Sequence, residues 1–171
     1  MRIMGVDPGL TATGYGIIEA SGRRPSLVEA GVLRSRDRDP LETKLLEIHR
    51  GLTEVIREFM PAIVVVEELY STYAHPRTAI LMGHARGIVY LAAADRGIPV
   101  MSYASTRIKN SLTGHGRASK EQVQKMIQHV FGLHRLPHPP DVADALAVAL
   151  CHHNAVMHEH SPSGVTKARR R

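Results

Sequence analysis

The sequence predicts an α/β domain with a mixed five-stranded sheet, in which an antiparallel meander is extended by parallel strands and helices cover both faces. Residues 2–7, 14–19 and 27–34 form short β-branched or alternating runs separated by glycine and proline, as in strands joined by tight connections. From Leu41 onward, helical segments alternate with apolar runs, the order typical of strands linked by crossover helices. The order β-β-β-α-β-α-β followed by helices therefore predicts a mixed sheet.

The first helix is predicted by a change of hydrophobic period from two residues to 3.6. It follows Asp39 and Pro40, which suit a helix cap and a first helical position, and Pro61 stops it. Apolar residues recur at helical spacing between these limits, at Leu41, Leu45, Ile48, Leu52, Val55 and Phe59.

The remaining elements are predicted from apolar and periodic runs. The segment AIVVVEEL, residues 62–69, indicates a buried strand that ends in two glutamates, and IPVMSY, residues 98–103, indicates another strand. Between them, residues 76–97 indicate a largely apolar helix. Three further helices are predicted from the runs TRIKNSL, KEQVQKMIQHVF and DVADALAVALCHH.

The length and charge of the chain indicate the number of its domains and the kind of partner that it binds. A chain of 171 residues suits one domain, which we expect to span residues 1–154, followed by a basic, disordered tail at 155–171 without apolar periodicity. The net charge of +6 favours a polyanionic partner such as nucleic acid. Because no signal peptide or membrane-spanning run is evident, we expect a cytoplasmic protein with no membrane partner. Cys151 is the only cysteine, which excludes an internal disulfide and a cysteine-rich zinc site.

Acidic residues stand at the ends of three predicted elements. Asp7 ends the first strand, Glu67 and Glu68 end the fourth, and Asp141 and Asp144 begin the last helix on one face. If the first and fourth strands are parallel neighbours, their carboxyl ends lie side by side, and a helix packed across that edge brings the other carboxylates. Such a cluster needs a cation, because like charges raise one another's pKa. Two Mg²⁺ ions about 4 Å apart would suit these oxygen ligands and a phosphate substrate.

Each acid also has an ordinary structural explanation. Asp7, before Pro8 and Gly9, suits the first position of a turn. Asp141 suits a helix cap, Asp144 suits a first helical turn, and one of two successive glutamates on a strand faces solvent. The convergence of three element ends favours the metal site over these separate explanations.

Four ordered motifs resemble the RuvC family of Holliday junction resolvases: GVDPGLTATGYGII, VVVEELY, RIKNSLTGHGRASKEQV and DVADALAVAL. The similarity runs from Arg2 to His153. It implies an RNase H-like fold and a homodimer that uses Mg²⁺ to nick two strands of a four-way DNA junction symmetrically during recombination and repair. It also implies cooperation with the branch-migration complex of RuvA and RuvB. The choice between Mg²⁺ and Mn²⁺ stays open.

The resemblance assigns the acidic residues to the active site. The family's catalytic and metal-binding acids correspond to Asp7, Glu67, Asp141 and Asp144. Some members have histidine in place of Asp141, so this chain has a full carboxylate set. Glu68 is carried over only as a neighbour of Glu67.

The resemblance also covers residues that contact DNA. Lys109 and Lys120 correspond to family lysines associated with DNA handling and catalysis, and Lys120 is therefore counted with the catalytic residues. Tyr70 falls at an aromatic position that the family places against bases at the junction centre. His75 and Arg77, in the loop that follows, offer further DNA contacts. Without the resemblance, the lysines suit ordinary surface positions and Tyr70 suits a cover over the local core.

Two other functions compete with a nuclease. The opening strand and glycine-threonine loop also resemble the first phosphate-binding loop of actin-like ATPases and sugar kinases, which need two related halves around the nucleotide. A junction-binding protein that lacks catalysis but keeps the scaffold is the other alternative. Intact carboxylates at all four positions argue against this last possibility.

A dimer surface is expected on the segment AILMGHARGIVYLAAADRG, residues 79–97. Its apolar residues surround more of the helix than one sheet-facing stripe requires. Gly83 and Gly87 share one face and permit close helix packing. We expect Leu81 or Ile88 on whichever apolar face does not meet the sheet. The alternative is that this helix is sandwiched inside the monomer.

Overall fold

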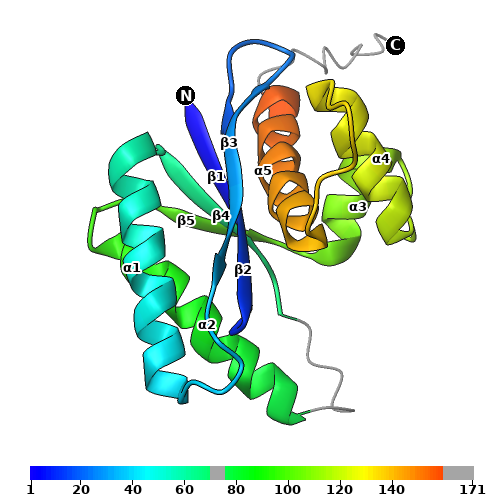
Figure 1. The fold of residues 1–171 in the computed structure, drawn as a ribbon. Coiled ribbons are helices and arrows are strands. Elements are labelled where there is room, and N and C mark those ends of the chain that lie inside the picture. Colours follow the sequence, from blue (N-terminus) through cyan, green and yellow to red (C-terminus); the bar gives the residue numbers. More distant parts are fainter. Residues whose placement is uncertain (70–75, 160–171) are drawn as a thin grey trace, which may run out of the picture.

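The computed structural model describes residues 1–69 and 76–159 and contains one five-stranded sheet in the order β3-β2-β1-β4-β5 (Figure 1). The strands β1, β2 and β3 form an antiparallel meander, and β4 and β5 add to it in parallel. The predicted mixed sheet is confirmed. The strand bounds are β1 Arg2–Asp7, β2 Ala12–Glu19, β3 Ser26–Arg34, β4 Ile63–Glu67 and β5 Val100–Tyr103.

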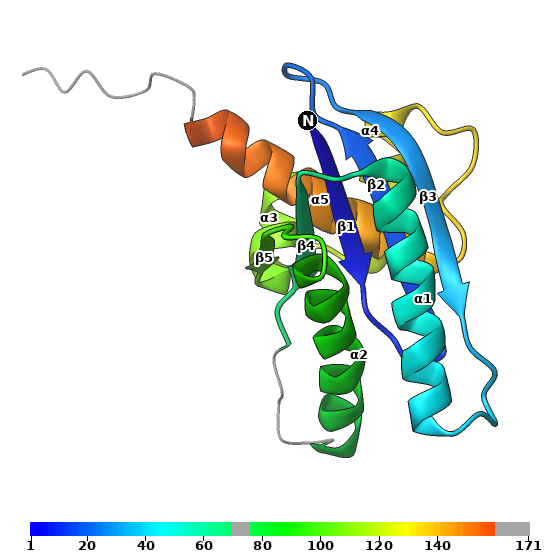
Figure 2. The ribbon, with the colours of Figure 1, turned by 90° about the vertical axis from the view of Figure 1, so that its left-hand side faces the viewer.

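Helices cover both faces of the sheet, as predicted. Figures 1 and 2 show α1 and α2 on one face and α3, α4 and α5 on the other. Strand residues alternate between these layers, so that Met4 and Val6 pack towards α1 and α2 while Ile3 packs towards α5. The helix bounds are α1 Leu41–Phe59, α2 Pro76–Ala94, α3 Ser105–Thr113, α4 Lys120–Phe131 and α5 Pro140–Glu159.

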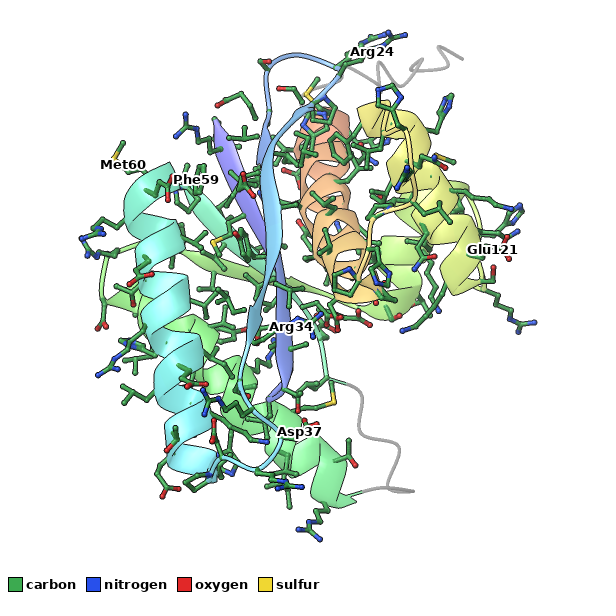
Figure 3. The ribbon with its side chains drawn as sticks, in the orientation of Figure 1. Arg24, Arg34, Asp37, Phe59, Met60 and Glu121 are labelled. Atoms are coloured by element: carbon green, nitrogen blue, oxygen red, sulfur yellow. The ribbon has the colours of Figure 1, made fainter. Side chains whose placement is uncertain are left out.

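The start of α1 differs from the prediction. Pro40 is the N-cap residue, with an extended ψ of 157°, and the helix begins at Leu41. Asp39 does not cap the helix, because it belongs to a turn in which its backbone N–H donates to the Arg36 carbonyl at 3.1 Å. The helix ends at Phe59 and Met60, which lie together at its carboxyl end in Figure 3.

The last helix is longer than predicted. It continues past Asn154 to Glu159, so residues 155–159 extend the helix instead of beginning a tail. Residues 160–171 lie outside the described part of the chain. None of the described helices is long and apolar enough to cross a membrane. Since residues 1–69 and 76–159 form one sheet, the second related half that an actin-like ATPase requires is not found among them.

Candidate active site

Two carboxylates leave the sheet side by side. The parallel strands β1 and β4 are neighbours, and Val6 pairs with Val66 directly before Asp7 and Glu67. Side chains alternate along a strand, so Asp7 shares a face with Ile3, which packs in the core beneath α5. By the same alternation Glu67 shares that face, and both carboxylates therefore project towards α5.

The helix α5 approaches β1 and β2 more closely than side chains would permit. A Cβ at Gly14 would lie 2.1 Å from the Asp141 carbonyl oxygen, and a Cβ at Gly5 would lie 2.0 Å from the Ala145 carbonyl oxygen. Only glycine leaves room for a helix backbone at these positions. The close approach carries Asp141 and Asp144 to the end of β1. Sequence reasoning did not use these strand glycines, although glycine inside a strand is a signal of close backbone approach.

The edge of the sheet opens into a cavity of about 600 Å³. Its acidic wall contains Asp7, Glu67 and Asp144, and its basic wall contains Lys109 and Lys120. Asp141 is half-buried and is not among the lining residues. Sequence reasoning singled out none of the other lining residues, although some of them stand inside the four motifs: Pro8, Leu69, Thr78, Ala79, Met82, Ser105, Ile108, Val123 and Ala147.

The first aspartate has a strongly altered acidity. The pKa of Asp7 is raised from 3.8 to about 7, chiefly by burial and then by the negative charges of Asp144, Asp141 and Glu67, in that order. The positive charge of Lys120 acts in the opposite direction. The four predicted acids therefore interact electrostatically around Asp7, as like charges in a shared site do.

A lysine partly balances this negative charge. The Lys120 Nζ lies 3.5 Å from the Asp144 Oδ2, and the lysine side chain is 78% exposed. Burial raises the pKa of Asp144, while Lys120 and, more weakly, Lys109 lower it. Both lysines predicted from the sequence thus stand beside the acids.

The donor set suits a hard divalent cation. All four acids offer oxygen atoms, which Mg²⁺ and Mn²⁺ prefer, and the raised Asp7 pKa reveals negative charge that is poorly compensated. Within residues 1–69 and 76–159, no three His, Cys, Asp or Glu side chains already form a metal-binding group. The chemistry of the site fits a metal, and its binding would require the carboxylate side chains to turn towards one another.

Among the other residues predicted to contact DNA, only Arg77 belongs to the described part of the chain. Arg77 is exposed in the first turn of α2, whereas Tyr70 and His75 lie outside the described residues. Glu68 lines the cavity, and its backbone N–H donates to the Tyr103 carbonyl at 2.9 Å.

The second helix exposes an apolar stripe. Ile80 is 62% exposed and Leu91 is 50% exposed, while Cβ atoms built on Gly83 and Gly87 would meet open space. Ile88 instead packs against the core between α2 and the sheet. Of the two alternatives that the sequence offered for the free face, Ile88 is therefore excluded, because the exposed stripe is turned by about one helical position from it. Leu81, the other alternative, is half-buried.

The comparisons with known proteins agree with the site. The family model for crossover junction endodeoxyribonuclease RuvC matches residues 3–152. A curated relative of that name from Rhodopirellula baltica is 50% identical over 151 residues, which cover 88% of this chain and 85% of the relative. Another from Desulforamulus reducens is 43% identical and covers 89% of this chain and 93% of the relative.

Solved structures of Holliday junction resolvases are also similar to this chain. Thermus thermophilus RuvC in complex with a Holliday junction substrate is 35% identical and superposes with a TM-score of 0.87, covering 93% of this chain and 96% of that chain. The yeast mitochondrial Holliday junction resolvase Ydc2, at 14% identity and a TM-score of 0.64, shares the fold. The family match, the identities and the predicted RNase H-like architecture agree, and the chain belongs to the RuvC family.

Proposed function

We propose that this protein is a metal-dependent endonuclease that resolves four-way DNA junctions by symmetric paired nicks in recombination and repair. One observation carries the proposal: Asp7, whose pKa burial and the charges of Asp144, Asp141 and Glu67 raise to about 7, lines a cavity that also holds Glu67, Asp144 and two lysines. This arrangement suits a cation and a phosphodiester together. The names of its relatives and the junction complex of the Thermus thermophilus protein support the substrate.

In this proposal Asp7, Glu67, Asp141 and Asp144 hold the metal, which is Mg²⁺, with Mn²⁺ as a substitute. Two bound ions would supply charge neutralisation for the attacking and leaving oxygens. The protein contributes orientation, since β1, β4 and α5 each fix the backbone of at least one carboxylate. Deprotonation of Asp7 must accompany metal binding, because a carboxylate binds a cation in its charged form.

The lysines have a separate role. The Lys120 ammonium is largely exposed beside Asp144, so it is free to contact a phosphate at the cavity mouth. Lys109 lines the same cavity. Both would stabilise negative charge on the reacting phosphate. We further propose that Tyr70 stacks on a base at the junction centre and that His75 and Arg77 contact the DNA backbone, as the family resemblance implies.

Paired nicks need two active sites. One acidic cluster cuts one strand, and a two-fold dimer supplies a second cluster in a symmetric position. We propose that the exposed stripe of α2, with Ile80, Gly83, Gly87 and Leu91, forms this homodimer interface. We also propose that the protein acts in the cytoplasm with the RuvA and RuvB complex.

A labelled four-way junction tests the function. The protein should cut the junction symmetrically in Mg²⁺ or Mn²⁺ and bind it without cutting in Ca²⁺, whose coordination is longer and less regular. The addition of ATP should change neither junction binding nor junction cleavage. Asp7→Asn should retain junction binding and lose most cleavage. Undiminished cleavage in EDTA would reject the metal site, and binding without cleavage under every condition would favour a non-catalytic junction-binding protein.

A further inference from the structure

The carboxyl end of β4 lies where the sheet stops. Pairing with β1 ends at Val66 and pairing with β5 ends at Glu67. Glu67 is thus the last strand residue, and on the β5 side the peptide that follows it is held by one hydrogen bond, in which the Glu68 N–H donates to the Tyr103 carbonyl at 2.9 Å. The direction of the Glu67 side chain depends on how firmly this peptide is held.

A side chain from α2 holds this strand end. The Arg86 Nη1 donates a hydrogen bond to the Glu67 carbonyl oxygen, and the Arg86 Nη2 donates to the Tyr90 hydroxyl at 2.8 Å. The Arg86 Cζ also lies 5.2 Å from the centroid of the Tyr90 ring. Arg86 and Tyr90 are four residues apart in α2 and so share one helical face. The guanidinium plane is therefore fixed from two sides.

The helix that carries Arg86 is itself firmly seated. Ala85 and Val89 are 0% and 1% exposed and pack in the same core cluster as Val66. The arginine consequently reaches β4 from the α2 face of the sheet, whereas the Glu67 carboxylate projects towards α5. The contact holds the backbone and leaves the carboxylate on the cavity wall.

We propose that Arg86, oriented by Tyr90, is a positioning residue that fixes the end of β4 and thereby aims the Glu67 carboxylate at the metal shared with Asp7. This inference rests on the proposed function, because it assumes that Glu67 is a metal ligand. Arginine suits the task because its planar fork donates two bonds in fixed directions, which the single ammonium of lysine does not reproduce. Groups that orient metal ligands typically affect metal affinity about 10- to 100-fold.

The test measures metal binding directly. Free Mn²⁺ is followed by electron paramagnetic resonance during titration of the full-length protein without DNA. We expect Arg86→Lys to weaken Mn²⁺ binding by about tenfold and Tyr90→Phe, which keeps the ring and removes the hydroxyl, by about two- to threefold. The double variant should resemble Arg86→Lys alone, because Tyr90 acts through Arg86.

Controls separate positioning from folding. Arg96→Lys, an exposed change just after the same helix, should leave Mn²⁺ binding unchanged. Cleavage by Arg86→Lys should recover substantially at high Mn²⁺, while junction affinity in Ca²⁺ should stay within about twofold. If Arg86→Lys does not fold, Tyr90→Phe still decides the matter, and its wild-type Mn²⁺ affinity would overturn the proposal.

Glu67→Gln distinguishes the possible failures. If Glu67→Gln weakens Mn²⁺ binding and Arg86→Lys does not, the positioning role is wrong and the proposed metal site stands. If Glu67→Gln leaves Mn²⁺ binding unchanged, Glu67 is no ligand, and the positioning role falls together with that part of the proposed function.

Discussion

Asp7→Asn should make the protein more stable while it removes cleavage. The folded-state pKa of Asp7, about 7, lies above its ordinary value of 3.8, so the folded chain binds this proton more tightly than the unfolded chain. The resulting stability is present in full below pH of about 3.8 and is lost as the pH rises towards 7. Above that pH the wild-type protein holds a buried charge that the neutral asparagine does not carry.

The size of the gain follows from the pKa difference. A difference of about three pKa units, at about 1.4 kcal/mol per unit, corresponds to about 4 kcal/mol. Water and ions in the open cavity reduce the repulsion between carboxylates. We therefore expect Asp7→Asn to raise the free energy of unfolding by about 2 to 4 kcal/mol at pH 8 and to change it little at pH 4.

Urea denaturation at pH 4, 6 and 8 in the presence of EDTA measures this difference. EDTA is needed because a bound cation would offset the same charge. Asp37→Asn is the matched control, since Asp37 projects from the exposed loop before α1 (Figure 3) and should give no comparable gain. A gain of equal size at pH 4 and pH 8, or a loss of stability at pH 8, would refute the reasoning.

Four further changes test other parts of the molecule. Gly14→Ala should destabilise the fold by about 1 to 3 kcal/mol in urea denaturation, because the new Cβ would lie 2.1 Å from the Asp141 carbonyl oxygen; unchanged stability would contradict the close approach of α5. Lys120→Met should reduce the single-turnover cleavage rate by about 100-fold with the fold intact, and a wild-type rate would remove it from catalysis. Leu91→Glu should give folded monomers in light scattering that no longer make coordinated double cuts, whereas a persistent dimer would place the interface elsewhere. Truncation after Glu159 should preserve cleavage and lessen the salt dependence of non-specific DNA binding, and an unchanged salt dependence would show that the tail does not contact phosphates.

The sequence was sufficient to predict the order of the elements and the ends at which the acids stand. Hydrophobic periods of two and 3.6 residues are local properties, so the strands and helices were recognised within a few positions. The position of Asp7 and Glu67 at strand ends was visible for the same reason. The start of α1 was mispredicted by one residue, because Pro40 has the extended backbone of an N-cap residue, with a ψ of 157°, and so stands just outside the helix.

The identity of the free face of α2 required the tertiary structure. Apolar residues surround that helix, so its sequence leaves open which ones meet the sheet. Packing against β4 buries Ala85 and Val89 and leaves Ile80 and Leu91 exposed. For this reason the sequence offered Leu81 and Ile88 only as alternatives, and the packing of Ile88 against the core excludes the second.

The raised pKa of Asp7 was likewise determined by the tertiary packing. Coulomb interactions and desolvation depend on distances between residues that are far apart in the chain, and those distances follow from the approach of α5 to Gly5 and Gly14. The hydrogen bond from Arg86 to the Glu67 carbonyl arises in the same way, since it joins α2 to the end of β4. The sequence by itself determined which carboxylates and lysines were available and at which ends of the strands and helices they stand. The packing of α2 and α5 on the sheet determined how close together these side chains lie, and hence the pKa of Asp7 and the direction of the Glu67 carboxylate.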